Sequence, residues 1–172
     1  MSRIYIDDEG DEVPFIVFIS HGRSELWRNV ERYINRTLDM ETIVLKEQYR
    51  GSTIVEKLED ETEAGDCAVI VMTPDDKMEN GNLRSRQNVI HEIGYLQALY
   101  GRERVIILKE SNVEFFSNNF GVEYIPFTGD AINSTFHTLR EALDEIYQDV
   151  VQDAADASAD DDDDEEEDDD DQ

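Results

Sequence analysis

Short, strongly hydrophobic runs alternate with amphipathic stretches along this chain. Five runs rich in β-branched and aromatic residues predict strands, at Pro14–Ser20, Thr42–Glu47, Cys67–Thr73, Arg104–Glu110 and Glu123–Gly129. A continuous hydrophobic run is typical of a strand that is buried on both faces, as in a parallel sheet. The third run is the most hydrophobic and is expected at the centre. The fifth contains a proline, which lacks an amide hydrogen and favours an edge position.

Hydrophobic residues recur at helical spacing between these strands. Four stretches predict helices: one capped by Ser24, one that begins with a capping-box pattern at Thr53 and Glu56, one that leads to Gly101, and one that carries Phe136. Strands that alternate with helices imply βαβ units with right-handed crossovers. We therefore expect a three-layer α/β fold with a central five-stranded parallel sheet.

Both ends of the chain differ from this pattern. Residues 1–12 are polar and acidic and are expected to form a flexible arm. Residues 153–172 hold 14 of the 43 acidic residues and no basic one, so they offer too little hydrophobic surface to repay the entropy of ordering. We expect a folded domain over residues 13–152 and a disordered acidic tail, which serves either solubility or the binding of a partner.

The net charge of −28 limits the classes of partner. Without the 14 acids of the tail, 29 acids still face 15 bases, which leaves a net charge of −14. Such a surface repels nucleic acids and anionic lipids, whose phosphates bind proteins through lysine and arginine. Arginine outnumbers lysine by 11 to 4, a bias that fits a salt-adapted organism and equally an ordinary acidic protein. No nucleic-acid or membrane partner is therefore expected.

No segment of the sequence suggests a membrane or secreted protein. There is no hydrophobic stretch near the roughly 18 residues that a membrane-spanning helix requires. The first residues lack the basic start and apolar middle of a signal peptide. Cys67 is the single cysteine and lies inside a predicted strand, so neither a disulfide framework nor a cysteine–histidine zinc site is expected. These features predict a cytoplasmic protein.

Candidate chemistry gathers in the loops that follow the predicted strands, because open parallel sheets bind ligands beyond the carboxyl ends of their strands. These loops read "SHGR", "EQYRGS", "TPDDKMENGN" and "KESN". The absence of GxGxxG, GxxxxGK[ST] and GxSxG motifs disfavours a standard dinucleotide-binding fold, a P-loop and a serine hydrolase. His21 fits either a general base or a turn residue. Asp75 and Asp76 resemble the metal-binding acids of response-regulator receivers, but the first strand ends in Ser20 and His21 where a receiver has acids, so no metal site is predicted.

The longest of these loops leads into a helix that carries a carboxylate close to the predicted core. The hydrophobic stripe of this helix is formed by Val89, Ile93, Leu96 and Tyr100. Glu92 lies at the margin of the stripe, one turn after Asn88. This spacing fits a partly desolvated carboxylate beside a ligand and equally a solvated glutamate that pairs with a nearby arginine.

Five blocks of the sequence resemble one known family. "FISHGRSE", "EQYRGSTIVEKLED", "CAVIVMTPDD", "RSRQNVIHEIGYLQALYGRERVIILKE" and "YIPF" are similar, in order and spacing, to bacterial and archaeal TIR-like domains first described as predicted nucleotide-binding proteins. The resemblance covers roughly Val13 to Tyr147. Related domains are effectors of cyclic-nucleotide-triggered antiphage systems. The resemblance therefore implies a flavodoxin-like TIR fold and hydrolysis of the nicotinamide–ribose bond of NAD⁺ in antiviral defence, with Glu92 as the catalytic residue.

The resemblance also implies roles for other residues at this edge. By motif position, the substrate-binding residues are Ser20, His21, Gly22, Arg23, Gly51, Asp75, Asp76, Arg86 and Asn88. The first four lie near the ribose and phosphates, and Gly51 belongs to a loop that commonly mediates assembly and gates the site in TIR domains. Arg86 fits equally a structural ion pair with one of the two aspartates, and Tyr95 and Trp27 are expected to be core aromatics. NAD⁺ enters as the substrate, and neither a cofactor nor a metal is implied.

Regulation and two alternative functions stay open. Because this chain offers no room for a sensor domain, the resemblance implies that a separate sensor protein, or a nucleotide bound to the TIR-like domain, supplies the trigger. It also implies a low-activity monomer that assembles into an active homo-oligomer. One alternative is a non-enzymatic nucleotide-binding or TIR interaction module. The other is an enzyme similar to nucleoside deoxyribosyltransferases, which exchanges nucleoside bases and leaves NAD⁺ intact.

Overall fold

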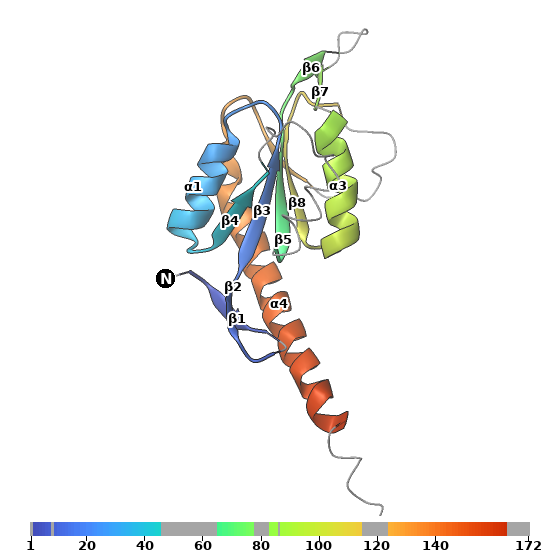
Figure 1. The fold of residues 1–172 in the computed structure, drawn as a ribbon. Coiled ribbons are helices and arrows are strands. Elements are labelled where there is room, and N and C mark those ends of the chain that lie inside the picture. The colour runs from blue at the N-terminus through green and yellow to red at the C-terminus, as the bar shows by residue number, and fades with distance from the viewer. Residues whose placement is uncertain are drawn as a thin grey trace, which may run out of the picture.

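The computed structural model describes residues 2–7, 9–45, 65–77, 83–85, 87–114 and 124–164. The central sheet consists, in spatial order, of β4 (Glu41–Val44), β3 (Ile16–His21), β5 (Cys67–Met72), β8 (Val105–Glu110) and β9 (Ile125–Phe127) (Figure 1). All neighbouring strands are parallel. The predicted five-stranded parallel sheet is confirmed, with the most hydrophobic strand at its centre and the proline-containing strand at one edge.

Helices cover both faces of this sheet. α1 (Trp27–Thr37) and α4 (Phe136–Asp164) lie on one face, and α3 (Gln87–Tyr100) lies on the other (Figure 1). Successive residues of a strand point to opposite faces, so in β5 Val69 contacts the layer of α1 and α4, whereas Ile70 contacts the layer of α3. All residues of β5 are buried, which explains its continuous hydrophobic sequence. The three-layer α/β architecture expected from the sequence is confirmed.

The N-terminal arm is a hairpin instead of the flexible segment expected from its composition. β1 (Ile4–Ile6) pairs antiparallel with β2 (Glu12–Pro14). The Tyr5 hydroxyl donates a hydrogen bond to Asp66 Oδ1 at 2.7 Å, and the Tyr147 hydroxyl of α4 donates one to a carbonyl of β1 at 2.7 Å. These long-range hydrogen bonds hold the described part of the arm against the body of the domain.

α4 extends well beyond the sheet (Figure 1). It ends at Asp164, so its last twelve residues belong to the segment 153–172, whose composition predicts disorder. The Arg104 guanidinium pairs with the Asp153 carboxylate, and the alanines that follow favour helix. The prediction of disorder is therefore wrong for the first part of the acidic tail, and residues 165–172 lie outside the described part.

Two smaller features differ from the expectation. β4 begins one residue before the predicted strand and ends three residues earlier, at Val44. The loop after β5 contains a short hairpin of β6 (Asp76–Lys77) and β7 (Leu83–Arg84), which its polar composition did not indicate. The helix predicted after Thr53 lies outside the described residues.

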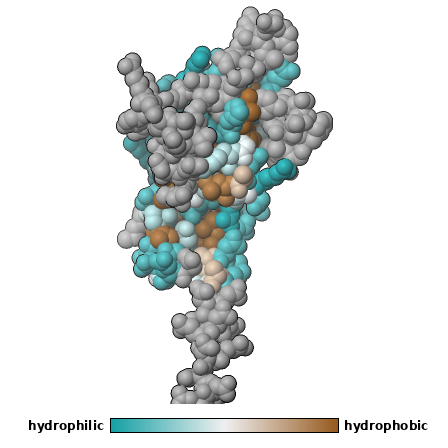
Figure 2. Space-filling model, turned by 45° about the vertical axis from the view of Figure 1, so that its right-hand side comes forward, coloured by the Kyte–Doolittle hydropathy of each residue, from teal (hydrophilic) through white to brown (hydrophobic). Residues whose placement is uncertain are grey.

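Hydrophobic surface is limited on the face shown in Figure 2. Among the atoms drawn in colour, hydrophobic side chains reach the surface as separate small patches between hydrophilic ones. Among the described residues, the large hydrophobic side chains that are exposed are Ile4, Ile6, Leu99 and Tyr124. Scattered residues of this kind are ordinary at a protein surface. Of the helices that the structure describes, none combines the length and the apolar composition needed to span a membrane.

Candidate active site

The order of the strands reverses between β3 and β5. From β3 the chain runs to β4 on one side and then returns to β5 on the other side. In open parallel sheets such a reversal leaves a crevice beyond the carboxyl ends of the two strands, where ligands bind. Ser20 and His21 end β3, and Thr73 follows β5. Residues from two of the loops singled out in the sequence therefore flank this crevice.

Buried polar side chains concentrate at the same edge. Seven of the described residues are both buried and polar or charged. Six of these lie at the carboxyl ends of β3, β5 and β8 or around the first turns of α3: Ser20, Thr73, Ser85, Glu92, Lys109 and Glu110. Burying a polar group costs free energy unless the group is hydrogen-bonded. This concentration indicates that the edge serves more than packing.

Glu92 is the carboxylate at the centre of this group. α3 directs Val89 and Ile93 into the core, and Glu92 between them is buried, with 5% of its surface exposed. The Ser20 hydroxyl donates a hydrogen bond to Glu92 Oε2 and is itself fully buried. Ser20 reaches α3 because it lies on the same face of β3 as Phe18. The alternative of a solvated surface glutamate is therefore excluded.

A second buried glutamate, Glu110, has a different environment. Its carboxylate accepts hydrogen bonds from the Asn112 amide at 2.7 Å, from Asn112 Nδ2 at 3.1 Å and from the Gly129 amide at 3.0 Å. These bonds fasten the loop after β8 to the turn after β9. A carboxylate whose oxygens are occupied by loop donors is structural, so Glu92 and Glu110 differ in role although both are buried.

His21 points to the opposite face of the sheet, toward α1. Its ring stacks on Trp27, with centroids 4.5 Å apart and planes inclined by 12°, and its Nδ1 donates to the Gly22 carbonyl at 2.7 Å. Burial lowers the pKa of this imidazole from its usual 6.5. Trp27 packs against the core on the same side, as expected of a core aromatic. Of the two roles open from the sequence, the geometry favours a turn residue beside the site.

The lowered pKa of His21 predicts that acid destabilises the fold. The unfolded chain binds a proton near the usual pKa of 6.5, whereas the folded imidazole binds it only at lower pH. The stability contributed by neutral His21 is therefore fully present above that pH and is lost as the pH falls below it, toward the folded pKa. Denaturant unfolding at about pH 7.5 and about pH 5.5 should show a smaller loss for His21→Gln than for the wild type. His137→Gln, at a side chain that is 85% exposed, should follow the wild type; the same behaviour in His21→Gln would contradict the assignment.

Gly22 leaves the space that the Asp75 side chain occupies. A Cβ atom at this position would lie 1.8 Å from Asp75 Oδ2 and 2.8 Å from its Cγ. Asp75 Oδ1 accepts a hydrogen bond from Thr73 Oγ1 at 3.2 Å, and Oδ2 is buried without a hydrogen-bond partner in the part of the chain that the structure describes. The carboxylate thus lies against the Gly22 backbone, where it joins the end of β3 to the end of β5.

Gly22→Ala should destabilise the domain by about 1 to 3 kcal/mol, because the added methyl group displaces the Asp75 carboxylate. In an Asp75→Ala background the same change should cost less than about 1 kcal/mol, since the obstructing atoms are gone. Denaturant unfolding of the wild type, both single variants and the double variant measures this coupling. Additive effects of the two substitutions would show that the Asp75 carboxylate does not lie against Gly22 in solution.

The remaining predicted site residues are only partly described. Arg23 is exposed in the loop that follows β3. Gly51 and Arg86 lie outside the described residues, and only the backbone of Asp76 and Asn88 is described. Their contacts with substrate stay predictions. Within the described ranges, no cluster of three or more histidine, cysteine, aspartate or glutamate side chains has the arrangement of a metal site.

Lys109 is a buried cation at this edge; the sequence placed it in the "KESN" loop but assigned it no role. It is in register with Met72 and alternates with Ile107, which places it on the α3 face near the end of β5. Its Nζ lies 5.1 Å from the centroid of the Tyr124 ring and 3.4 Å from the Glu110 carbonyl oxygen. Burial lowers the pKa of this ammonium group. The sequence did contain an indication of this site, namely a lysine near the end of a hydrophobic strand. Because side chains alternate between the two faces of a sheet, its position places it on the same face as the helix of Glu92.

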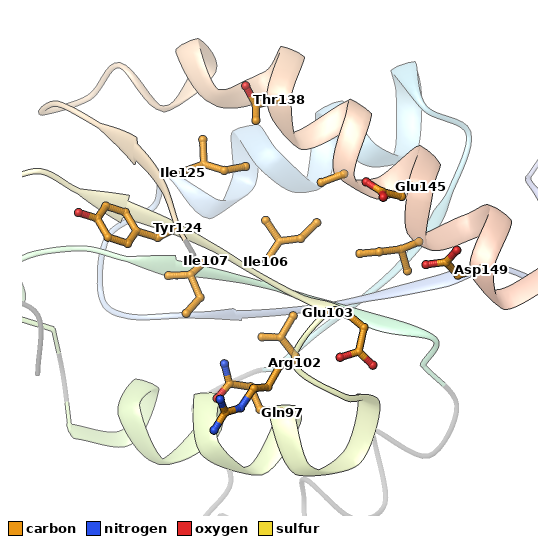
Figure 3. Close-up of a pocket in the computed structure, with 13 residues that line it drawn as sticks. Gln97, Arg102, Glu103, Ile106, Ile107, Tyr124, Ile125, Thr138, Glu145 and Asp149 are labelled. Carbon is orange, nitrogen blue, oxygen red and sulfur yellow. The ribbon is translucent and has the colours of Figure 1, made fainter. Parts of the chain in front are cut away.

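A cavity lies away from Glu92, between α4, β9 and the first half of β8 (Figure 3). Its volume is about 590 Å³, and its aliphatic floor includes Ile106, Ile107 and Ile125. Its acidic side chains, such as Glu145 and Asp149 of α4, are exposed to solvent. Because none of its described titratable side chains is buried, the chemistry favours the Glu92 edge over this cavity as the active site.

Comparison with known proteins identifies the family. The family model described as CAP12/Pycsar effector protein, TIR domain, matches residues 16–129, which run from β3 to the turn after β9 and include Ser20 and Glu92. The chain is 35% identical over 136 residues to the uncharacterized protein YuaY of Escherichia coli (strain K12), across 71% of this chain and 45% of YuaY, so it spans less than half of that relative. It is 32% identical over 137 residues to protein tirC of Dictyostelium discoideum, across 70% of this chain and 68% of tirC. The resemblance to TIR-like effectors is thereby confirmed, and the chain belongs to the CAP12/Pycsar effector TIR domain family.

Proposed function

We propose that this domain hydrolyses the nicotinamide–ribose bond of NAD⁺ and that Glu92 is its catalytic residue. The observation that carries the proposal is the Glu92 carboxylate, 5% exposed and hydrogen-bonded by Ser20, beside the crevice of a doubly wound parallel sheet. Membership of a TIR effector family supports the same function.

One carboxylate suffices for this reaction because the nicotinamide ring of NAD⁺ is already cationic and leaves as a neutral molecule. Ordinary glycosides need a second, protonated carboxyl group to protonate their leaving group, and NAD⁺ does not. As the bond from C1 of the ribose to nitrogen breaks, positive charge develops on the ribose, and a carboxylate beside it stabilises this oxocarbenium-like transition state. Burial of Glu92 strengthens the attraction by excluding water. Water then adds to C1, which yields ADP-ribose and a proton.

Ser20 acts in this proposal as a positioning residue for Glu92, because its buried hydroxyl donates to the carboxylate. Ser20→Ala should lower kcat about tenfold to a hundredfold with little change in KM, since a hydrogen bond to a charged group contributes about 1.5 to 3 kcal/mol. The steady-state rate of nicotinamide release measures both constants. Ser24→Ala, in the same loop with its hydroxyl bonded to the Leu26 amide, should keep the wild-type kcat. A rise in KM with unchanged kcat would instead make Ser20 a substrate-binding residue.

Three measurements on the full chain separate this proposal from its alternatives. In the first, the concentrated protein is incubated with NAD⁺ and the release of nicotinamide is measured. In the second, it is incubated with a purine deoxynucleoside and a second free base, and base exchange is measured. In the third, its melting temperature is measured with and without NAD⁺. Release of nicotinamide supports the proposal. Exchange of the bases with intact NAD⁺ would replace it with a deoxyribosyltransferase-like enzyme. A raised melting temperature without consumption of NAD⁺ would replace it with a nucleotide-binding module.

The proposed role in the cell is that of an effector that depletes NAD⁺ during antiviral defence. An unrestrained NAD⁺ hydrolase poisons its own host, so we propose a low-activity monomer that becomes active when it assembles into a homo-oligomer. The trigger in this proposal is a nucleotide signal, received by the domain itself or by a separate sensor protein. Membership of the CAP12/Pycsar effector TIR domain family supports this role.

A further inference from the structure

Three arginines lie in a row on α1, although the overall charge of the chain is strongly negative. Arg28, Arg32 and Arg36 follow one another at intervals of four residues, so they share one face of the helix. All three side chains are exposed. Arg32 and Arg36 line two neighbouring shallow hollows of about 250 and about 300 Å³. We call Arg28, Arg32 and Arg36 the arginine row.

Among the residues that the structure describes, few acids lie around the arginine row. Glu25 pairs with Arg28, and Glu31 lines the smaller hollow. The described lining of the larger hollow has no acidic residue; beside Arg32 and Arg36 it consists of Asn29, Tyr33, Thr37, Asn133 and Phe136. Three arginines and one glutamate give α1 a positive charge within a chain of net charge −28. Like charges one turn apart destabilise a helix, so an anionic partner would relieve a repulsion that the fold retains.

The chain itself carries a matching anion. Residues 153–172 hold 14 acids and no base, and residues 160–171 form an uninterrupted acidic run. Arginine is well suited to such a partner because its planar guanidinium group binds carboxylates through two parallel hydrogen bonds. The arginine row on α1 and the acidic run near the end of the sequence are therefore complementary in charge.

The geometry prevents this run from lying along the arginine row of its own chain. α4 begins beside the row, where Phe136 stacks on Tyr33 at 4.2 Å and lines the larger hollow. It then continues to Asp164 (Figure 1), and a helix of this length spans about 43 Å. The acids beyond Asp164 lie within seven positions of it, and seven residues reach at most about 25 Å when fully extended. While α4 is helical, the acidic run can cover an arginine row only on another molecule.

We propose that the acidic run of one chain docks on the arginine row of a second copy. The contact is heterologous, since a different surface is used on each copy. After one such contact, one copy keeps a free row and the other keeps a free run. Such contacts build rings or open chains rather than closed dimers. This association goes beyond the proposed hydrolysis and does not depend on it, because neither surface contains Glu92.

Two complementary variants of the full chain test the contact. The row variant is Arg32→Gln/Arg36→Gln, and the run variant replaces the acids of residues 160–171 by asparagine and glutamine. The matched control is Arg102→Gln/Arg140→Gln, which removes two exposed arginines elsewhere. Sedimentation velocity is measured at about 0.1 M salt, where the Debye length of about 10 Å limits the repulsion between the acidic bodies.

The wild type and the control should associate with increasing concentration, and each variant alone should associate at least about tenfold more weakly. An equimolar mixture of the row variant and the run variant should form heterodimers and nothing larger, because only one complementary pair of surfaces remains. About 1 M salt, with a Debye length of about 3 Å, should dissociate all complexes. No NAD⁺ is present, so the result is independent of turnover.

Several outcomes would overturn the inference. A wild type that stays monomeric, a row variant that associates as strongly as the control, or a mixture that forms no heterodimer would each do so. Association that survives in the run variant would assign the contact to other surfaces. A labelled DNA duplex that binds the wild type and not the row variant, without self-association, would instead make the arginine row a nucleic-acid contact.

Discussion

Glu92→Gln is expected to lower the rate of NAD⁺ cleavage at least about 1,000-fold, because it removes the only negative charge proposed to face the developing cation of the ribose. The fold should survive the change. Glutamine has the shape of glutamate, and its carbonyl oxygen can still accept the hydrogen bond that Ser20 donates. The unfolding free energy should therefore change by no more than about 1 kcal/mol, or about 2 to 4 °C in melting temperature.

The control for this prediction is Glu141→Gln, which removes the same charge from an exposed position on α4. It should keep both the wild-type rate and the wild-type melting temperature. Measuring nicotinamide release and thermal unfolding on the same three preparations separates loss of chemistry from loss of fold. Retention of more than about a tenth of the wild-type rate by Glu92→Gln would contradict a catalytic role for this carboxylate.

Glu110→Gln is expected to show the opposite profile, with a large loss of stability and little loss of intrinsic activity. The Glu110 carboxylate accepts hydrogen bonds from the amides of Asn112 and Gly129 and from the Asn112 side chain. Glutamine replaces one of the two acceptor oxygens by an NH₂ group, which can only donate. At least one of the N–H groups that now bond to Glu110 therefore loses its acceptor. The loss should be about 3 kcal/mol, which corresponds to about 6 to 12 °C for a domain of this size.

The matched control is Glu145→Gln, at an exposed position of α4, whose effect should stay within about 0.5 kcal/mol. Calorimetry gives the melting temperatures, and activity is compared well below the transition of the weaker variant. Equal melting temperatures for the two variants would show that the hydrogen bonds of Glu110 do not stabilise the fold. A collapse of kcat in a folded Glu110→Gln protein would move this residue into the active site.

The parts of the fold that were predictable from the sequence depend on strong local patterns. The runs that became β5 and β8 are buried on both faces, so their hydrophobicity identified them without any knowledge of their neighbours. Alternation with helices then fixed a parallel sheet, and Pro126 correctly indicated the edge strand. The helix spacing placed Glu92 at the margin of the residues that became core but left a solvated side chain equally open, and its catalytic role was implied only by the resemblance to TIR-like domains.

The parts that were missed depend on contacts between distant residues. Tyr5 orders the N-terminal hairpin through Asp66, which lies 61 positions away, and neither residue signals this pairing locally. The Ser20 hydroxyl and Glu92 are 72 positions apart, so their hydrogen bond follows only from the register of β3 beneath α3. Lys109 ends a hydrophobic run, and its position in the strand shows which face of the sheet it occupies only once the faces themselves are assigned.

The acidic end of α4 shows a different limit of composition-based reasoning. Low hydrophobicity and high charge predict disorder on average, but a helix that is already formed and packed can continue through alanine-rich sequence at little cost. Val150 is still buried against the core, and Asp153 is held by Arg104. The helix therefore continues past the packed part of the domain as far as Asp164.

The most direct test of the proposed reaction is the identity of the products formed from NAD⁺. Concentrated wild-type protein, followed by chromatography and mass detection, should release nicotinamide and ADP-ribose in equal amounts, and Glu92→Gln at the same concentration should release neither. Nicotinamide mononucleotide and AMP would place the cleavage at the pyrophosphate instead of at the glycosidic bond. That result, or equal nicotinamide release by both proteins, would contradict glycosidic cleavage at Glu92.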